Sequence, residues 1–566
     1  MGINGIDLGI YVIEFLGQKI KLYFGSTPTF RTHYFTRELA KRKKMKAFVI
    51  IIGLIITLAF APFLLGFSSE GTLVMPPEDD NFLDTTFGTN GKAVTPVGIA
   101  QAVAIQPDGK VVAAGYAFNG TNNDFAILRY NQNGTLDDTF DGTTNANGRI
   151  LTPVGQFDEE AFGIAIQSDG KIVLVGQTYD GAKTNLAFIR YNADGTLDSS
   201  FDGDGRVIVS PSVGNALLRS VAVRPDGRIV AAGVASNGLN FDIVVVQLNA
   251  NGSLDQTFVG NSGNSNGVVT TAVGTANDQA YGVGIRPDGK IVVAGYLSTA
   301  TGTDSLLLRY QADGRLDTSF SGDGIMIHSF SPDTDEALAL ALMPDGRIVI
   351  AGCIRNGAPN DFLIGRFTED GSVDPAFGTN GAIMMPFSST VDISLGVAVQ
   401  PDGKVVAVGF GNNGINNDFA VTRINTNGTP DLTFGGDGRI LTAIGTSADQ
   451  ANAVAIQPDG KIVVAGRTAG TTADVAIVRY QSGFVSITGR VTSPNGTALR
   501  NTSVMLIDEN GLSQTASSSS FGIYEFRDVP IGRTYTLRAA SKRYRFAPRI
   551  LAINESLSGM DLIGLE

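Results

Sequence analysis

The sequence predicts an all-β protein: a seven-bladed β-propeller closed by its N-terminal strand, a small β-sandwich after it, and a hydrophobic signal or anchor helix before it. Two β-rich apolar runs joined at an Asp-Gly turn recur seven times in the 566 residues, a pattern typical of tight hairpins. The turn glycines are spaced by 61, 57, 62, 57, 57 and 57 residues, without helical periodicity between them. A period near this length that holds four short runs is typical of one propeller blade. The turn glycines are Gly109, Gly170, Gly227, Gly289, Gly346, Gly403 and Gly460.

Composition narrows the chemistry that this chain can perform. The formal net charge of −12 argues against a nucleic-acid partner. A single cysteine, Cys353, excludes an internal disulfide, and two histidines leave little for a zinc site or a histidine base. Tryptophan is absent, so the stacking of sugars would fall to tyrosine and phenylalanine.

The start of the chain carries an export signal or a membrane anchor. Residues 47–67 hold no charge and follow a basic stretch at 41–46; at about 1.5 Å per residue they just span a bilayer of about 30 Å. If translation starts at Met45, residues 45–68 instead form a cleaved signal peptide and residues 1–44 are a misassigned extension; otherwise 1–44 are cytoplasmic. Residues 69–81 are expected to be a linker. Both alternatives place the rest at the cell surface or outside the cell, with membrane contact only through 47–67.

Each repeat is expected to supply four strands, a to d, from the axis outward. In the first repeat they are predicted at 101–106, 110–116, 124–131 and 149–153. Because neighbouring strands alternate in direction, the b–c and d–a loops share one face. The b–c loops differ between repeats, as at 118–123, 178–183 and 354–359, and variable polar loops on a rigid scaffold are where recognition is commonly built. This face is therefore the candidate binding face.

Small residues favour strand a as the innermost strand, because strands converge at a propeller axis and bulky side chains would collide there. Tight hairpin packing would explain the same residues. One small column is Ala102, Gly163, Ser220, Gly282, Ala339, Gly396 and Ala453, and the second is Ala104, Ala165, Ala222, Gly284, Ala341, Ala398 and Ala455.

A basic residue in strand c precedes an aspartate of the c–d loop by eight positions in nearly every repeat, with Gln247 as the exception. We expect structural ion pairs that fix the loop. Phenylalanines of the same loop, from Phe87 to Phe434, are expected to pack between blades. The expected pairs are Arg129–Asp137, Arg190–Asp198, Arg309–Asp317, Arg366–Asp374, Arg423–Asp431 and Arg479–Asp84.

The last of these pairs predicts how the ring closes. Leu83, Asp84 and Phe87, with the strand at 92–96, come before the first hairpin, whereas no such segment follows Arg479. The N-terminal strand should therefore complete the last blade and bring Asp84 beside Arg479. Such closure removes exposed strand edges.

The repeat resembles a known family. Leu-Asp-Ser-Ser-Phe-Asp-Gly-Asp-Gly-Arg, Ala-Val-Ala-Ile-Gln-Pro-Asp-Gly-Lys-Ile-Val-Val-Ala-Gly and Asp-Phe-Ala-Ile-Leu-Arg-Tyr-Asn look like the delta-60 repeat family of bacterial exported proteins. The resemblance covers residues 82–480. It implies a propeller of an extracellular or surface protein and brings no catalytic residues with it.

Residues 484–566 lack the period and show shorter alternating runs with turns at Asn495-Gly496 and Asn510-Gly511, which predicts a small β-sandwich. Thr488-Gly-Arg-Val-Thr and Phe521-Gly-Ile-Tyr-Glu-Phe resemble the carboxypeptidase regulatory-like domain of prealbumin type. That resemblance implies a non-catalytic accessory or adhesion-like module. Ser519 and Ser520 stand where the family has an acid, which puts an ion-binding role of the module in doubt.

Five repeats begin strand a with an acid. A ring of carboxylates at the mouth of the channel would suit Ca²⁺ or a cationic ligand. Alternatively, each acid caps backbone amides of its own loop. The candidate ligand-binding acids are Glu159, Asp278, Asp335, Asp392 and Asp449.

Three functions remain open. The leading hypothesis is a non-enzymatic exported or surface binding protein of adhesion type, which presents the b–c and d–a loop face to an extracellular protein or polysaccharide and needs no cofactor apart from the Ca²⁺ considered above. The alternative is a propeller enzyme, a hydrolase or lyase, that uses carboxylates at the channel mouth. The third is a purely structural envelope protein.

Overall fold

The computed structural model describes residues 10–15, 18–23, 82–141, 147–211, 213–261, 263, 266–355, 357, 359–469, 473–508, 511, 513–530, 533–553 and 557–565. No α-helix occurs among these residues, and the regular elements are β-strands. The chain divides into two units, residues 1–74 and residues 75–566. The all-β class predicted from the sequence is therefore confirmed for the described residues.

The first unit contributes one antiparallel hairpin, in which β1 (Ile10–Phe15) pairs with β2 (Gln18–Tyr23). No helix in the part of the chain that the structure describes is long and apolar enough to cross a bilayer. The predicted signal or anchor at residues 45–68 and the linker lie outside the described residues, so both stay predictions.

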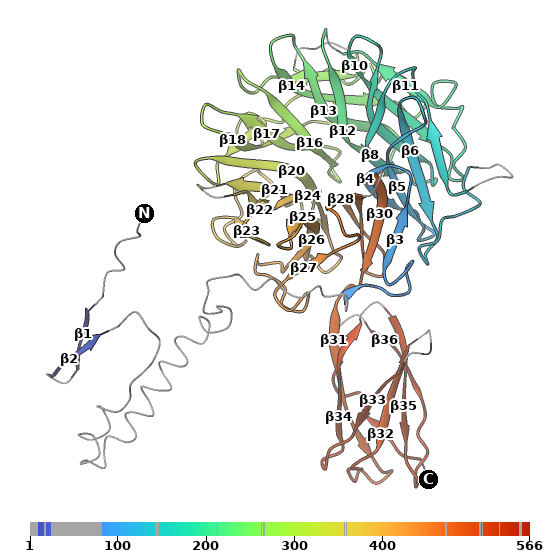
Figure 1. The fold of residues 1–566 in the computed structure, drawn as a ribbon, viewed down its shortest axis with the longest axis vertical. Coiled ribbons are helices and arrows are strands. Elements are labelled where there is room, and N and C mark those ends of the chain that lie inside the picture. The colour runs from blue at the N-terminus through green and yellow to red at the C-terminus, as the bar shows by residue number, and fades with distance from the viewer. Residues whose placement is uncertain are drawn as a thin grey trace. The chain divides into compact units, whose positions relative to one another are not determined.

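The repeat region forms seven four-stranded antiparallel units, here called sheets 1 to 7 in chain order, and Figure 1 shows them set side by side with their first strands toward the middle. Sheets 1 to 3 are β4 (Ile99–Ile105), β5 (Val111–Phe118), β6 (Asn123–Tyr130), β7 (Arg149–Thr152); β8 (Glu159–Ile166), β9 (Ile172–Tyr179), β10 (Thr184–Tyr191), β11 (Arg206–Val209); and β12 (Ala216–Val223), β13 (Ile229–Ser236), β14 (Phe241–Leu248), β15 (Val268–Thr271).

Sheets 4 to 6 follow the same order. They are β16 (Asp278–Ile285), β17 (Ile291–Ser298), β18 (Thr303–Tyr310), β19 (Ile325–His328); β20 (Thr334–Leu342), β21 (Ile348–Arg355), β22 (Asp361–Phe367), β23 (Ala382–Met385); and β24 (Ile393–Val399), β25 (Val405–Asn412), β26 (Asn417–Ile424), β27 (Arg439–Thr442). Sheets 4 and 5 are joined by a single parallel pair, Thr303 with Thr334, a link that the sequence does not reveal.

Sheet 7 combines the two ends of the repeat region. It consists of β28 (Asp449–Ile456), β29 (Ile462–Ala469), β30 (Ala473–Tyr480) and, as its outer strand, β3 (Lys92–Thr95). Ala93 lies opposite Ile477 in this pairing. In Figure 1 the blue strand β3 accordingly runs beside the orange strand β30.

Apolar side chains fill the space between neighbouring sheets. Each cluster joins one sheet to the next, as where Phe188 of sheet 2 packs with Val244 of sheet 3. Val463 of sheet 7 packs in the same way with Val111 of sheet 1. Phenylalanines of the c–d loops are fully buried in these clusters, where they gain the burial free energy of large aromatic rings.

The C-terminal domain has two sheets. One has the order β34 (Ile523–Pro530), β31 (Phe484–Thr492), β37 (Leu562–Ile563), and the other has β33 (Ser513–Ser517), β32 (Ser503–Asp508), β35 (Arg533–Ala540), β36 (Arg549–Ile553). Ile487, Leu506 and Leu537 belong to one buried cluster that both sheets share. These two packed sheets form the predicted β-sandwich.

Candidate functional site

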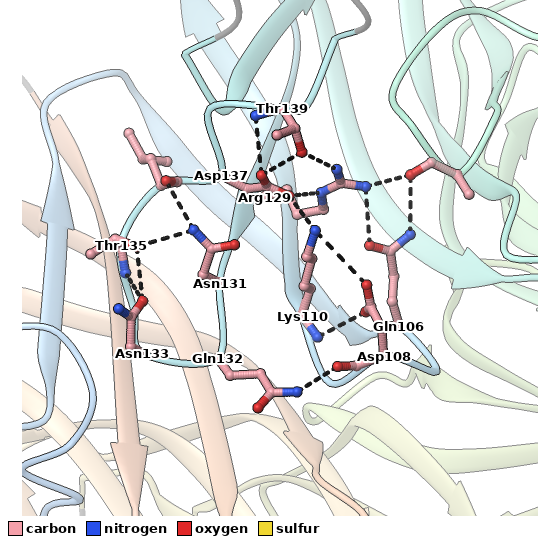
Figure 2. Close-up of polar contacts among 12 residues, drawn as sticks. Gln106, Asp108, Lys110, Arg129, Asn131, Gln132, Asn133, Thr135, Asp137 and Thr139 are labelled. Atoms are coloured by element: carbon pink, nitrogen blue, oxygen red, sulfur yellow. Dashed lines mark hydrogen bonds and ion pairs between the residues drawn. The ribbon is translucent and has the colours of Figure 1, made fainter.

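A buried ion-pair network recurs in the repeats, and Figure 2 shows it in sheet 1. Arg129 Nε lies 2.7 Å from Asp137 Oδ2, and Lys110 Nζ lies 2.8 Å from the same oxygen. The Thr139 hydroxyl donates to Asp137 Oδ1 at 2.7 Å. The Arg129 guanidinium lies over the Phe140 ring, 4.3 Å from its centroid, so cation–π attraction adds to the ion pair.

The other repeats place the expected pairs in the same way. The distances from arginine Nε to aspartate Oδ2 are 2.6 Å for Arg190–Asp198, 2.6 Å for Arg309–Asp317, 2.8 Å for Arg366–Asp374, 2.6 Å for Arg423–Asp431 and 2.9 Å for Arg479–Asp84.

Each arginine of this column also bridges to the following sheet. Arg129 donates through Nη1 to the carbonyl of Ala193, and Arg423 donates to that of Ser482. Arg479 of sheet 7 donates to the carbonyl of Gln132 in sheet 1 at 2.6 Å. The arginine column therefore fixes the c–d loop and holds neighbouring sheets together.

Sheet 3 keeps this bridge with a different residue. Gln247 stands where the other repeats have arginine, and it donates to Asp255 at 2.6 Å. Arg224, which directly follows strand β12, donates to Gln247 Oε1 at 2.8 Å and to the carbonyl of Ala312 in sheet 4 at 3.2 Å. The guanidinium therefore comes from the end of β12 instead of from strand c, and the contact with the next sheet is preserved.

The candidate ligand-binding acids do not form an accessible ring. Glu159, Asp278, Asp335, Asp392 and Asp449 are each at most 1% exposed. Asp449 Oδ2 accepts from the backbone N–H of Ile444 at 2.7 Å and of Gly445 at 3.2 Å, and Asp392 does the same with Phe387 and Ser388.

The expectation that these acids bind a ligand is therefore corrected. The d–a loop folds back over each carboxylate because its free backbone N–H groups need an acceptor. Among the described residues, no group of three or more His, Cys, Asp or Glu side chains is arranged to hold a metal ion.

A different set of side chains occupies the inner strands near the candidate binding face. Every strand a carries a β-bulge at the same place, as between Leu218 and Ser220 and between Ala280 and Gly282. A bulged residue is left out of the ladder, and bulges commonly re-aim a side chain next to a functional site. The bulged residues, here called the bulge ring, are Gln101, Phe162, Arg219, Tyr281, Leu338, Leu395 and Asn452.

A second column lies on strand b directly after its glycine, close to the b–c loop. It varies as much as the bulge ring does, although the positions around it hold small or apolar residues. Its members are Tyr116, Gln177, Val234, Tyr296, Cys353, Phe410 and Arg467.

Arg219, Tyr281 and Tyr296 form the most distinctive cluster of these two columns. The Arg219 guanidinium lies 4.1 Å from the centroid of the Tyr281 ring. The rings of Tyr281 and Tyr296 are stacked at 5.7 Å with an interplanar angle of 26°. Burial and then Tyr281 raise the pKa of Tyr296, so its phenol stays protonated at neutral pH.

Two glutamates at the start of strand a lie beside these columns. Burial raises the pKa of Glu336, against hydrogen bonds from Cys353 and Thr303 that lower it. Burial likewise raises the pKa of Glu160, against a hydrogen bond that Gln177 Nε2 donates to it at 2.8 Å. An acid whose pKa is raised retains its proton nearer to neutral pH and is a better general acid.

Sheet 7 contributes amide side chains to these columns. Arg467 Nη2 donates to Gln450 Oε1 at 3.0 Å, and Gln450 Nε2 donates to Asn452 Oδ1 at 2.8 Å. Asn452 in turn donates to the carbonyl of Ala100 in sheet 1 at 2.8 Å. The site therefore combines amides, aromatic rings, two arginines and two glutamates.

The sequence shows the second column, the position after the strand-b glycine, but sequence reasoning gave it no function and missed the bulge ring. The small residue that follows each bulge drew attention, whereas the variable position just before it did not. The signal that could have revealed these positions is that their residue type changes from repeat to repeat while the surrounding positions stay the same. A repeated scaffold needs the same residue in every repeat, whereas a binding site needs different ones.

Family models match most of the repeat region and the C-terminal domain. A domain of unknown function described as a β-propeller (DUF5122) matches residues 106–140, 167–201, 224–258, 286–320, 344–377, 400–434 and 457–483. A carboxypeptidase regulatory-like domain matches residues 486–553. No curated protein matches the chain.

Solved structures also match at low identity. Sqt1 from Chaetomium thermophilum is 12% identical with a TM-score of 0.39, over 69% of this chain and 97% of its own. The polysaccharide lyase Uly1 is 12% identical with a TM-score of 0.43, over 74% and 94%. An ulvan lyase of polysaccharide lyase family PL25 is 14% identical with a TM-score of 0.39, over 69% and 94%.

These matches correct the leading functional hypothesis. We expected a non-enzymatic binding protein, partly because histidine and tryptophan are scarce. Two of the matching structures are polysaccharide lyases, so the comparisons do not support that expectation; at 12–14% identity they show a likeness of fold alone.

Proposed function

The chain carries seven β-propeller repeats of DUF5122 and one carboxypeptidase regulatory-like domain, and we infer its function from the residues of the candidate site. We propose that it is an enzyme that cleaves a polysaccharide by acid–base chemistry at the inner strands, on the face of the b–c and d–a loops. The cluster of Arg219, Tyr281 and Tyr296 beside Glu336 is the observation that carries this proposal.

The composition of the site supports a sugar chain as the substrate. Side-chain amides donate and accept hydrogen bonds, as sugar hydroxyls require, and Gln101, Gln177 and Gln450 are partly exposed there. Aromatic rings offer flat apolar surface with a polar edge, and Tyr281, Tyr296 and Phe410 are partly exposed as well. A few polar groups among aromatic side chains are the usual composition of sites for small molecules and oligosaccharides.

We assign the acid–base roles to Tyr281 and Tyr296 because their rings stack at 5.7 Å beside the Arg219 guanidinium. A positioned phenol can give or take a proton at a reacting oxygen. Glu336 is the second proton donor, because burial raises its pKa. The d–a acids take no part, since each of them is at most 1% exposed.

The experiment is a cleavage assay with the purified chain. Neutral and acidic polysaccharides are incubated with the protein, and new reducing ends and unsaturated ends are measured separately. We expect cleavage of at least one polysaccharide, and a loss of about 100-fold or more in rate for Tyr281→Phe and for Tyr296→Phe, the usual scale of a lost acid–base group.

Two control variants test whether the loss is specific. Tyr544→Phe and Glu525→Gln change the same residue types in the C-terminal domain, where Tyr544 lies beside Arg543 and Glu525 pairs with Arg527. Both should retain full rate. If Tyr281→Phe cleaves as fast as the unchanged protein, the assignment of the site is wrong.

We also propose that the seven sheets form a closed ring. Three observations support it: β3 completes sheet 7, Arg479 donates to Gln132 of sheet 1, and Val463 packs with Val111. Cysteines introduced at Thr95 and Val475, which are paired in register, should form a disulfide in a Cys353→Ala background. If both introduced cysteines react with a thiol label and no disulfide forms between them, the proposed closure is wrong.

Finally, we propose that the enzyme acts outside the cytoplasm, because residues 47–67 are suited to export and an exported enzyme would reach extracellular polysaccharides. The sandwich would then serve as an accessory module. N-terminal sequencing of the mature protein tests this proposal, and a mature chain that starts at Met1 in the soluble cytoplasmic fraction would contradict it.

A further inference from the structure

The C-terminal domain has a pocket of its own, which the proposed cleavage does not use. It has a volume of about 580 Å³ and is lined by Pro494, Asn495, Arg543 and Tyr544. The lining therefore holds one cation and one side-chain amide, and no carboxylate among the described residues. None of these residues belongs to the bulge ring or to the column after the strand-b glycine.

Backbone contacts fix the segment that carries the cation. The backbone N–H of Leu565 donates to the carbonyl of Arg545 at 2.7 Å, and the N–H of Arg545 donates to the carbonyl of Leu565 at 3.4 Å. Tyr544 lies directly against Gly564, where an added Cβ would be 3.0 Å from the Tyr544 Cβ. The Arg543 guanidinium lies 5.3 Å from the centroid of the Tyr544 ring. The arginine is thus held beside an anchored ring at the wall of the pocket.

The amide of Asn495 presents its nitrogen to the pocket. Its Oδ1 accepts hydrogen bonds from the hydroxyl of Thr497 at 3.0 Å, from the backbone N–H of Thr497 at 3.4 Å and from the hydroxyl of Ser493. Because a backbone N–H requires an acceptor, these bonds fix which way the amide points. Among the described residues Nδ2 has no acceptor, so it is a donor available to a ligand.

Exposed cations surround the pocket. Lys542, Arg543 and Arg545 are all exposed, and within the part of the chain that the structure describes no carboxylate lies within 4.0 Å of their charged nitrogens. The domain's Arg527 and Arg533, by contrast, each have a carboxylate partner at 2.9 Å and 3.1 Å. In a chain of net charge −12, three unpaired cations within four residues form a local surface that attracts anions.

The donors define the chemistry of the ligand. The planar guanidinium of Arg543 matches two oxygens of one anion with parallel hydrogen bonds, and Asn495 Nδ2 can reach a further oxygen of the same group. A phosphate offers three acceptor oxygens and more charge than a carboxylate, and further phosphates of a polymer would meet Lys542 and Arg545. We propose that this pocket binds a phosphate group of an anionic polymer. The inference goes beyond the proposed function and does not depend on cleavage.

The test is a titration of the full-length protein by calorimetry. The ligands are polyphosphate, inorganic phosphate and polyglutamate, each at low and at high salt. Polyphosphate should bind about tenfold more tightly than the other two, because the fork, the amide and the flanking cations all act on it. Its affinity should fall as the salt concentration rises, since exposed charges are screened.

Variants of the pocket separate the fork from the charge. Arg543→Gln should weaken polyphosphate binding about tenfold or more, the scale of a lost charge-assisted pair of hydrogen bonds. Arg543→Lys should retain part of the affinity, since it keeps the charge but lacks the fork. Asn495→Asp keeps the oxygen that serves the turn and replaces the donor by a negative oxygen, so it should weaken binding at least as much as Arg543→Gln.

The matched control is Arg527→Gln, which removes the same charge from an arginine of the same domain that is 76% exposed and should leave binding unchanged. Full binding by Arg543→Gln, or an equal loss for Arg527→Gln, overturns the site. Equal affinity for polyphosphate and inorganic phosphate overturns the polymer, and equal affinity for polyglutamate overturns the choice of phosphate. Polyphosphate binding by a protein that cleaves no polysaccharide supports this inference and counts against the proposed function alone.

Discussion

Arg479 and Asp84, which are 395 positions apart in the sequence, form a buried ion pair of 2.9 Å in sheet 7. Arg479 also donates to Gln132 of sheet 1, and Lys461 lies 3.5 Å from Asp84. Arg533 of the C-terminal domain donates to Asp84 Oδ1 at 3.1 Å. One carboxylate therefore holds the first and last strands of the repeat region together.

Removing the arginine of this pair should destabilise the fold strongly. Arg479→Met leaves Asp84 buried beside fewer cations, and breaking one side of a buried pair costs about 3–5 kcal/mol. The free energy of unfolding, measured with urea, should fall by that amount. Arg527→Met, in a pair whose arginine is 76% exposed, is the control and should cost about 0–1 kcal/mol. Equal losses for the two variants would refute the role of burial.

The displaced guanidinium of sheet 3 predicts a compensating pair of substitutions. Arg224→Gln should destabilise the chain because the carbonyl of Ala312 loses its donor. Gln247→Arg adds a second buried cation beside Arg224 and should also be unfavourable. Together the two changes restore the pattern of the other repeats. The double variant should therefore lose less free energy of unfolding than the sum of the losses of the two single variants, by about 0.5–3 kcal/mol. Strictly additive losses would argue against this exchange.

The buried aspartates predict how stability depends on pH. Burial acts to raise the pKa of Asp431, but the Arg423 charge and hydrogen bonds from Thr433 and Lys404 outweigh it and hold the pKa at about 2. A lowered pKa means that the stabilisation is complete above the unfolded value near 3.9 and is lost as pH falls towards 2. When the pH is lowered from 5 to 2, the free energy of unfolding of Asp431→Asn, measured with urea, should fall by about 2 kcal/mol less than that of the unchanged protein. An identical pH dependence of both proteins would contradict the assignment.

Glycine is required where neighbouring sheets touch. Gly428 has a φ of +82°, and a Cβ there would lie 2.1 Å from the backbone nitrogen of Gly378 in the preceding sheet. Gly428→Ala should therefore cost several kcal/mol, the sum of about 1–2 kcal/mol for the left-handed backbone and about 1–3 kcal/mol for the overlap. Gly436, with a φ of +77° and no atom within 4 Å of its Cβ position, isolates the backbone cost. Similar thermal shifts for both alanine variants would show that the close approach is unimportant.

What the sequence by itself determined is the repeated part of the molecule. The Asp-Gly turns and the alternation of apolar residues recur seven times, and the spacing of arginine and aspartate by eight positions recurs five times. These patterns are local, and their repetition makes the interpretation of each repeat more secure. Strand bounds differed from the structure by a few residues, because strands extend into the loops where register and bulges decide their ends. The pairing of Arg479 with Asp84 was also predictable, since only one repeat lacked its own aspartate.

Only the tertiary structure decided what the unlike residues do. The acids at the start of strand a looked like a ligand ring, and their burial beneath the d–a loops depends on how each loop folds back on its own carboxylate. The cluster of Arg219, Tyr281 and Tyr296 arises from two sheets whose bulges bring together residues about 60 positions apart. Local patterns specify strands and turns, but a site made between sheets depends on contacts that no single repeat contains.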